Sequence, residues 1–214
     1  SPKDWFGGGR GYQLTTDNKV FHEGSASGKI ERVGDAQGFG TLTSGDSAEQ
    51  YRGKRIKYSG FLRTKDAKAA GLWMRFDSVA DGKVKQVAFD NMMSRPVTGT
   101  SDWKQYSVIL DVPVEATKFN FGFLLNGGGT VWGDGLTIEV LGKIGEGPKT
   151  TGLAPAVLER INDARSGNLD FEGGVHDTGS PNGWGGGGEG YKLTLAKDIV
   201  HQGKASGRIE RVGE

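Results

Sequence analysis

The sequence predicts an all-β protein whose strands form an antiparallel two-sheet jelly-roll sandwich. Apolar and polar residues alternate in short segments over residues 1–146, which is typical of strands with one buried face. Glycine makes up 38 of the 214 residues and clusters in turn-like runs such as Gly7–Gly9 and Gly127–Gly129. Short strands joined by glycine-rich turns, with no helical period in this region, favour a sandwich over other architectures.

The first strands are expected in the N-terminal half of this region. Residues 56–63 show the alternation well, because Ile56, Tyr58, Gly60 and Leu62 share one side while the other side carries Lys57, Ser59, Phe61 and Arg63. Earlier strands of the same character are expected at Tyr12–Thr15, Ser27–Val33 and Gly38–Thr43.

The remaining strands are expected between residues 72 and 140. Lys118–Leu125 places Phe119, Phe121 and Phe123 on one side, which assigns that side to the core. Further alternating segments are Leu72–Asp77, Val84–Phe89, residues 106–112 and residues 136–140. Two tryptophans at segment ends, Trp103 and Trp132, are expected in the core or at its rim.

One stretch alone is expected to be helical. Residues 154–164 carry Pro155 near the start and apolar residues at Val157, Leu158 and Ile161. This stretch follows a segment rich in glycine, proline and threonine. We therefore expect a module over residues 1–146, a linker with a short helix over 147–167, and a further segment over 168–214.

The last segment repeats the start of the chain. Trp5–Gly34 aligns with Trp184–Gly213 without a gap, and 18 of the 30 positions are identical. About two identities would be expected by chance from average composition. A period of 179 residues indicates a duplicated domain, because solenoid and propeller units repeat every 20–50 residues or so. Residues 168–214 are thus expected to form the N-terminal part of a second copy.

Composition excludes several functions. The net charge is +1 with acids and bases interspersed, so we expect no nucleic-acid partner. No run approaches 18 apolar residues, so we expect no membrane insertion. The absence of cysteine excludes disulfides, thiol nucleophiles and thiolate metal sites. The three histidines are scattered, and no nucleophile stands with a base, so no catalytic constellation is predicted.

Two glycine-rich motifs lack the context that their functions need. Gly185–Gly190 matches G-x-G-x-x-G but precedes a strand-like run rather than a helix, which indicates a surface loop. Gly24–Gly28 resembles a nucleophile elbow, yet Ala26 occupies the position that requires serine. Neither motif predicts a catalytic or dinucleotide site.

The best candidate site is a face of the Leu72–Asp77 strand. Alternation puts Trp73, Arg75 and Asp77 on one side, and such an aromatic ring beside polar groups suits sugar recognition. The same surface is expected to continue through Asp90, Asn91 and Arg95. Three uses stay open for these six residues: glycan binding, packing of a neighbouring domain, and a purely structural role. An alternative is that the sandwich is itself a lyase or hydrolase, with Arg75, Asp77 and Asp90 as its catalytic cluster.

Several motifs also resemble a known family. The second copy carries Asn168–Glu172, Gly183-Trp184 and His201–Lys204, and the first carries Gly71–Arg75 and Val131–Asp134. These stretches resemble galactose-binding-like jelly-roll modules related to carbohydrate-binding modules. In particular, they resemble accessory domains attached to bacterial tail-specific serine peptidases and erythromycin-esterase-like proteins.

The resemblance implies a non-catalytic binding module of a larger bacterial hydrolase, in the periplasm or secreted. The implied partner is a glycan or the catalytic domain of the same polypeptide; a structural spacer or dimerisation module is the alternative. Related jelly rolls often hold a structural calcium between their first and last strands. The matching positions here are Asp134 and Glu172, and backbone carbonyls would have to supply the other oxygens.

The first copy has no counterpart of Asn168–Glu172 ahead of Trp5. A jelly roll that lacks its first strand has an open sheet edge and a slot in its core. We therefore consider that Asn168–Glu172 completes the first module, within one molecule or in a strand-swapped homodimer. Simple truncation is the alternative.

Overall fold

The computed structural model describes residues 4–34, 38–153, 157–158, 175, 181, 191–200 and 204–212. The chain divides into two compact units, Ser1–Pro155 and Ala156–Glu214. The strands of both units pair antiparallel, so the prediction of an all-β antiparallel fold is confirmed. Val157 and Leu158 are helical, and the rest of the expected helix lies outside the described residues.

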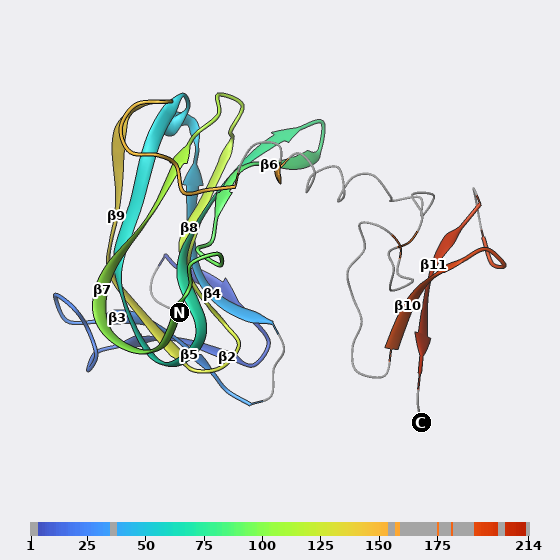
Figure 1. The fold of residues 1–214 in the computed structure, drawn as a ribbon, viewed down its shortest axis with the longest axis horizontal. Helices are drawn as coiled ribbons and strands as arrows, with labels where there is room; N and C mark the ends of the chain where they lie inside the picture. Colours follow the sequence, from blue (N-terminus) through green and yellow to red (C-terminus); the bar gives the residue numbers. More distant parts are fainter. Residues whose placement is uncertain are drawn as a thin grey trace. The chain divides into compact units, whose positions relative to one another are not determined.

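The first unit contains nine strands in its described part and one short 3-10 helix, η1 (Glu49–Tyr51). Figure 1 shows these strands as two packed layers. In chain order they are β1 (Phe6–Gly8), β2 (Tyr12–Asp17), β3 (Ser27–Arg32), β4 (Phe39–Ser47), β5 (Lys54–Ala80), β6 (Lys83–Asp90), β7 (Val97–Asp111), β8 (Lys118–Asn126) and β9 (Thr130–Lys143).

Strand β5 belongs to both layers. Its first part, residues 54–65, lies between β7 and β9, and β3 and β2 extend this first sheet beyond β9. Its second part, residues 69–80, lies between β8 and β6, and β4 and β1 extend this second sheet beyond β8. The pairing of β5 with β7 is irregular between Leu62 and Ala70, where the strand crosses from one sheet to the other. The separate segments expected at 56–63 and 72–77 are thus one strand.

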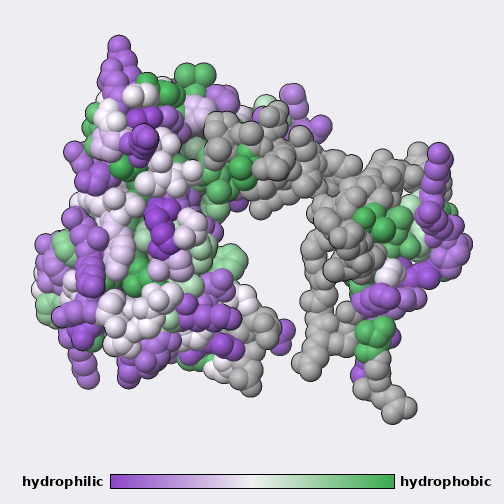
Figure 2. Space-filling view, viewed as in Figure 1, coloured by the Kyte–Doolittle hydropathy of each residue, from purple (hydrophilic) through white to green (hydrophobic). Residues whose placement is uncertain are grey.

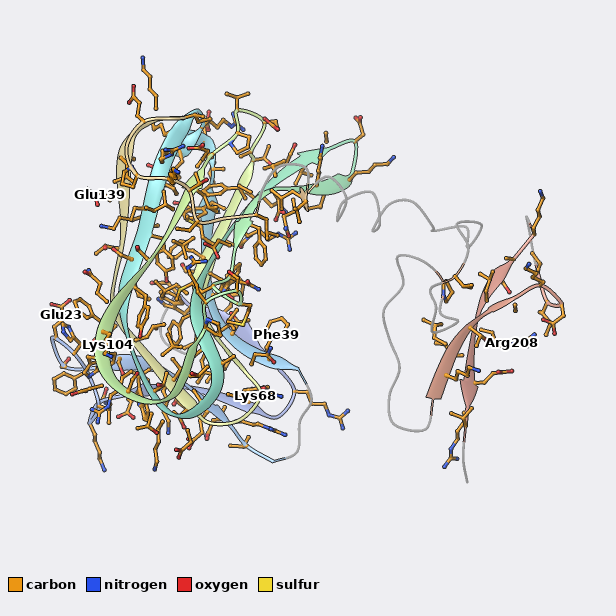
Figure 3. All side chains as sticks on the ribbon, in the orientation of Figure 1. Glu23, Phe39, Lys68, Lys104, Glu139 and Arg208 are labelled. Carbon is orange, nitrogen blue, oxygen red and sulfur yellow. The ribbon has the colours of Figure 1, made fainter. Side chains whose placement is uncertain are left out.

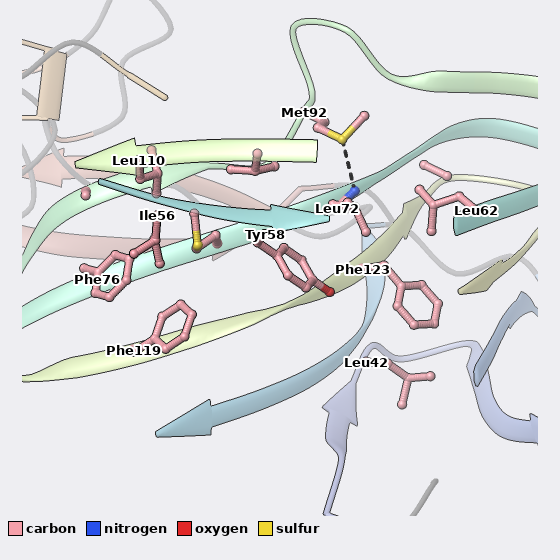
Figure 4. Close-up of a cluster of buried hydrophobic side chains, with 14 of the residues drawn as sticks. Leu42, Ile56, Tyr58, Leu62, Leu72, Phe76, Met92, Leu110, Phe119 and Phe123 are labelled. Carbon is pink, nitrogen blue, oxygen red and sulfur yellow. Dashed lines mark hydrogen bonds between the residues drawn. The ribbon is translucent and has the colours of Figure 1, made fainter. Parts of the chain in front are cut away.

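The core fills the space between the two sheets (Figure 4). Ile56, Tyr58 and Leu62 of the first sheet are fully buried, as the alternation predicts. From the second sheet, Phe119 stacks on Phe76 with ring centroids 4.5 Å apart. Phe123 is also buried, so the phenylalanine side of β8 faces the core as expected.

The chain after β9 packs back onto the first unit. Thr151 N–H donates to Ile109 O at 2.8 Å, and Leu153 N–H donates to Phe89 O at 3.0 Å. Arg55 holds this segment, because its Nη1 donates to the carbonyl oxygens of Glu146 at 3.0 Å and Pro148 at 2.9 Å. Residues 144–153, which we call the C-terminal strap, therefore belong structurally to the sandwich.

The second unit contains a hairpin of β10 (Tyr191–Ala196) and β11 (Ser206–Arg211). Its register is that of β2 and β3 moved by 179 residues, since Tyr12 pairs with Arg32 and Tyr191 pairs with Arg211. Ser206 Oγ donates to Ile199 O just as Ser27 Oγ donates to Val20 O. The two repeated sequences therefore form the same local structure. Asn168–Glu172 lies outside the described residues.

Polar residues cover most of the first unit's surface that is visible in Figure 2, with apolar residues scattered among them. Among the residues that the structure describes, none forms a helix with the length and hydropathy of a membrane span.

Candidate functional site

The outer face of the second sheet carries the first three predicted residues together. Leu72, Met74 and Phe76 are fully buried in the core. The alternate residues Trp73, Arg75 and Asp77 therefore share the opposite side, as the sequence predicts. Across β8 they pair with Gly122, Asn120 and Lys118 respectively.

Trp73 extends over its neighbouring strand. Its indole Nε1–H donates to Thr41 Oγ1 at 3.0 Å, and Thr41 lies on β4, two strands away from β5. Strands are about 4.8 Å apart, so the indole must lie across β8, where Gly122 leaves room for it. A Cβ at Gly122 would come within 2.0 Å of Leu42 O, so no other residue fits this position. The half-buried ring thus forms a fixed aromatic surface.

Arg75 is a cation of this face, as is Lys118 on β8. Arg75 Nε donates to Asp77 Oδ1 at 2.7 Å, and the carboxylate is nearly buried while the arginine side chain is 31% exposed. Within the described part of the chain, this is the hydrogen bond that the structure gives the Arg75 side chain. Its terminal nitrogens therefore retain donors for a ligand, held in place by Asp77.

Two phenylalanines widen the apolar part of the face. Phe6 on β1 pairs with Thr43 of β4, and Phe39 lies on β4 two residues before Thr41. Both rings are more than half exposed, at 58% and 56%. Phe39 lies on the opposite side of the sandwich from Glu139, which is on the outer side of the first sheet (Figure 3). The outer face of the second sheet, which we call the Trp73 face, thus combines three aromatic rings with hydroxyl, amide and guanidinium groups.

Asp90, Asn91 and Arg95 form a separate network. Asp90 pairs with Met74 in the ladder, so its side chain is on the inner side of the sheet. Arg95 donates to both Asp90 oxygens, at 3.2 and 2.6 Å, and the carboxylate also accepts Met92 N–H at 2.8 Å. Asn91 Oδ1 accepts Met93 N–H at 3.1 Å. These contacts hold the loop after β6, and Asp90 does not join the Trp73 face.

This separation bears on the enzyme alternative. Asp77 and Asp90 lie on opposite sides of the sheet, and each carboxylate is paired with an arginine. General acid–base chemistry would need carboxylates that face one substrate. The arrangement has the geometry of two structural ion pairs.

Asp134 is held by backbone amides. Its Oδ2 accepts the N–H groups of His22 at 2.7 Å and Glu23 at 3.1 Å, and its Oδ1 accepts Gly135 N–H at 2.8 Å. These are nitrogen donors, whereas calcium needs six to eight oxygens. In the described ranges no three His, Cys, Asp or Glu side chains gather as a metal would require. A calcium site with Glu172, which lies outside these ranges, stays a prediction.

Two other tryptophans, Trp103 and Trp132, belong to the first sheet. Trp103 and His22 are in a T-shaped arrangement, and the His22 ring stacks on Phe61 at 3.7 Å between centroids. Trp132 is 8% exposed and donates from Nε1 to Asp17 Oδ2 at 2.9 Å. That hydrogen bond is the main cause that lowers the pKa of Asp17. Burial raises this pKa, and the backbone N–H groups of residues 19 and 20 lower it further.

Sequence reasoning identified Trp73, Arg75 and Asp77 but missed Thr41, Gly122, Phe6 and Phe39. These four residues lie on other strands. They become neighbours of Trp73 through strand order, which one strand's alternation cannot reveal.

Comparison with curated proteins gives one strong match. An uncharacterized HTH-type transcriptional regulator, YbfP of Bacillus subtilis (strain 168), is 40% identical over 131 residues, which is 60% of this chain. The chain spans 43% of that protein's length. No family model matches the chain.

Solved structures are similar in fold. A Clostridium thermocellum endo-1,4-beta-D-xylanase 10B structure of CBM22-1 and GH10 modules, complexed with xylohexaose, superposes with a TM-score of 0.50 and 15% identity. The match covers 64% of this chain and 26% of that one. The C-terminal family 22 carbohydrate-binding module of Clostridium thermocellum Xyn10B gives a TM-score of 0.48 at 13% identity, covering 68% and 91%. The chain thus has the jelly-roll fold found in carbohydrate-binding modules.

Proposed function

We propose that the first unit is a non-catalytic binding module and that the Trp73 face binds a glycan. The observation that carries this proposal is the Trp73 indole, fixed across Gly122 by its hydrogen bond to Thr41 and flanked by Arg75. A pyranose ring presents an apolar C–H side and a rim of hydroxyls, so it needs an aromatic surface beside polar groups.

The arrangement favours an extended neutral chain over a single sugar. Phe6 and Phe39 lie on β1 and β4, away from Trp73 on β5, so aromatic contacts are spread across the sheet. Asn120 and Arg75 lie beside them and can bond to hydroxyls. Xylohexaose, a neutral chain, accompanies the similar xylanase structure, and we propose neutral β-linked oligosaccharides as the first ligands to test.

The test is a glycan array followed by calorimetry on the best neutral oligosaccharide. Trp73→Ala should weaken its binding on the order of tenfold or more, because buried aromatic anchors dominate binding energies. Trp103→Ala, a matched change on the first sheet, should leave the affinity unchanged. Equal affinities for the wild type and a folded Trp73→Ala variant would overturn the proposal.

A partner domain is the second candidate for the same face. The chain matches YbfP at 40% identity but spans 43% of it, so in that protein the matched region is joined to a further part of the chain. A helix-turn-helix regulator binds DNA through a dedicated helical motif. In such a protein the sandwich would receive a ligand or pack against the neighbouring domain. Hydrogen exchange of the β4 and β8 amides, measured with and without glycan, distinguishes ligand binding from domain packing. Added glycan should slow exchange on these strands only if the Trp73 face binds it.

The parent protein is a further part of the proposal. Attachment to a tail-specific peptidase, and location in the periplasm or outside the cell, rest on the sequence motifs alone. The similarity to a transcriptional regulator offers a different parent.

A further inference from the structure

A second polar site lies at the end of the first sheet, away from the Trp73 face. It is a shallow pocket of about 330 Å³, at the lower end of the size range of small-molecule sites. Residues of β3, β5, β9 and the turn before β9 line it: Lys29, Glu31, Arg32, Lys65, Asp66, Gly129, Thr130 and Trp132.

Arg32 has no partner for its side chain in the described part of the protein. Its backbone N–H donates to Gly129 O at 3.1 Å, but its Nε is buried and forms no hydrogen bond. A buried donor that loses water without gaining an acceptor is costly, more so when it is charged. A guanidinium presents pairs of parallel N–H donors that match the two oxygens of a carboxylate, and the described structure gives those of Arg32 no acceptor.

The other charges of the pocket leave Arg32 uncompensated. Lys29 Nζ contacts Glu31 Oε2 at 2.5 Å, so these two neutralise each other. Asp66 Oδ1 accepts the Thr100 hydroxyl at 3.1 Å, and Lys65 is exposed beside it. Arg32 and Lys65 are therefore the two cations of the pocket to which the described structure assigns no anion, and Arg32 is the one with a buried, unpaired nitrogen.

We infer that this pocket binds the carboxylate of an acidic sugar, with Arg32 as its main contact. The two rim carboxylates, Glu31 and Asp66, would repel a doubly charged phosphate but can accept hydrogen bonds from sugar hydroxyls. Thr130 adds a further polar group. A singly charged, hydroxyl-rich ligand such as a uronic acid fits this mixture. The choice of a sugar rests on the proposed function, whereas the anion site depends on the pocket alone.

The residues that β3 supplies recur in the second unit. Lys29, Glu31 and Arg32 correspond to Arg208, Glu210 and Arg211 of β11, in a hairpin of identical register. Arg208 Nη1 lies 3.6 Å from Glu210 Oε1, and this ion pair is at the position equivalent to the Lys29–Glu31 pair. The charge pattern of the pocket edge is thus present in both copies.

The test titrates the full chain with a galacturonic acid oligosaccharide, its neutral galactose counterpart and inorganic phosphate. Amide shifts at Gly129 and Thr130 report the location. We expect the acidic oligosaccharide to bind at least about tenfold tighter than the neutral one, and salt to weaken its binding. Arg32→Gln should abolish this preference, and Arg32→Lys should restore little of it because the fork is lost.

Lys65→Gln, at an exposed position, tests the pocket without risk to folding and should weaken the acidic ligand severalfold. Lys104→Gln, an exposed lysine on β7, is the charge-matched control and should have no effect. Trp73→Ala should leave the preference for the acid intact, so this result is separable from failure of the proposed function. Equal binding of acidic and neutral ligands, or stronger binding of phosphate, would overturn the inference.

Discussion

Tyr58 places an unpaired polar atom in the apolar core. Its side chain is fully buried, and its hydroxyl has no hydrogen-bond partner among the described residues. Burial raises the pKa of this phenol, because the ionised form would lose its hydration. The hydroxyl thus adds desolvation cost without a hydrogen bond in return.

Tyr58→Phe should therefore raise the free energy of unfolding by about 1 kcal/mol. Tyr12→Phe is the matched control, because the Tyr12 hydroxyl donates to Gly38 O at 2.7 Å and accepts Gly127 N–H at 3.0 Å. That control should lower the free energy of unfolding by a similar amount. Urea unfolding of both variants measures the difference, and a destabilised Tyr58→Phe would contradict this account.

Asp17 predicts a pH dependence of stability. The hydrogen bond from Trp132, and then the backbone N–H groups, lower the pKa of Asp17 below its ordinary value of 3.8. The charged carboxylate therefore stabilises the fold above pH 3.8, and this stabilisation is lost as the pH falls through the lowered pKa.

Asp17→Asn should be less stable than the wild type near pH 6, and the gap should narrow as the pH falls below 3.8. Unfolding by urea at a series of pH values measures this gap. A constant difference across the series would mean that Asp17 acts through packing rather than charge.

At the same scale, the sequence predicted part of the candidate site. Trp73, Arg75 and Asp77 follow from period-two alternation on one strand, and the structure puts them on one face. Thr41 and Gly122 could not be predicted, because their proximity to Trp73 depends on β4 and β8 being neighbours. Asp90 was expected beside them, but it pairs with Met74, whose side chain is in the core, and therefore lies on the inner side.

At the scale of elements, alternation located the strands but not their continuity. Residues 56–63 and 72–77 were expected as two strands and form parts of β5. Residues 64–70 contain no proline or turn pair that would end a strand, yet they lack the alternation of the flanking segments. The crossing between sheets therefore has no simple sequence pattern.

The C-terminal strap gives the element-scale prediction. Arg55 donates to both Asp111 oxygens, at 2.7 and 2.9 Å, and to the strap carbonyls. In Arg55→Leu, the amides of Thr151 and Leu153 should exchange with solvent faster than in the wild type, because the strap loses its anchor.

Leu125 N–H in the centre of the second sheet is the internal reference and should keep its exchange rate. The measurement is hydrogen exchange followed by NMR. If Leu125 and the strap accelerate by the same factor, Arg55 stabilises the whole sandwich rather than the strap.

For the whole molecule, the repeat was visible in sequence and recurs as identical hairpin register. Burial, however, differs between the copies. Ile30 is fully buried between the sheets, whereas Ile209 at the equivalent position is 72% exposed. Strand pairing is a local property of the hairpin, while burial depends on a second layer. Sequence identity therefore predicts the strand pairing of the hairpin better than it predicts the burial of its side chains.

The double membership of β5 constrains how this molecule can vary. Unless a β-bulge takes it up, each residue added between positions 64 and 70 would reverse which side chains of residues 72–77 point outward, because orientation alternates along a strand. One insertion would turn Trp73 toward the interior and expose Leu72 to water. Two insertions would restore the pattern. Relatives that use the Trp73 surface should thus change the length of this corner in even steps, while the loops remain free to vary by any number.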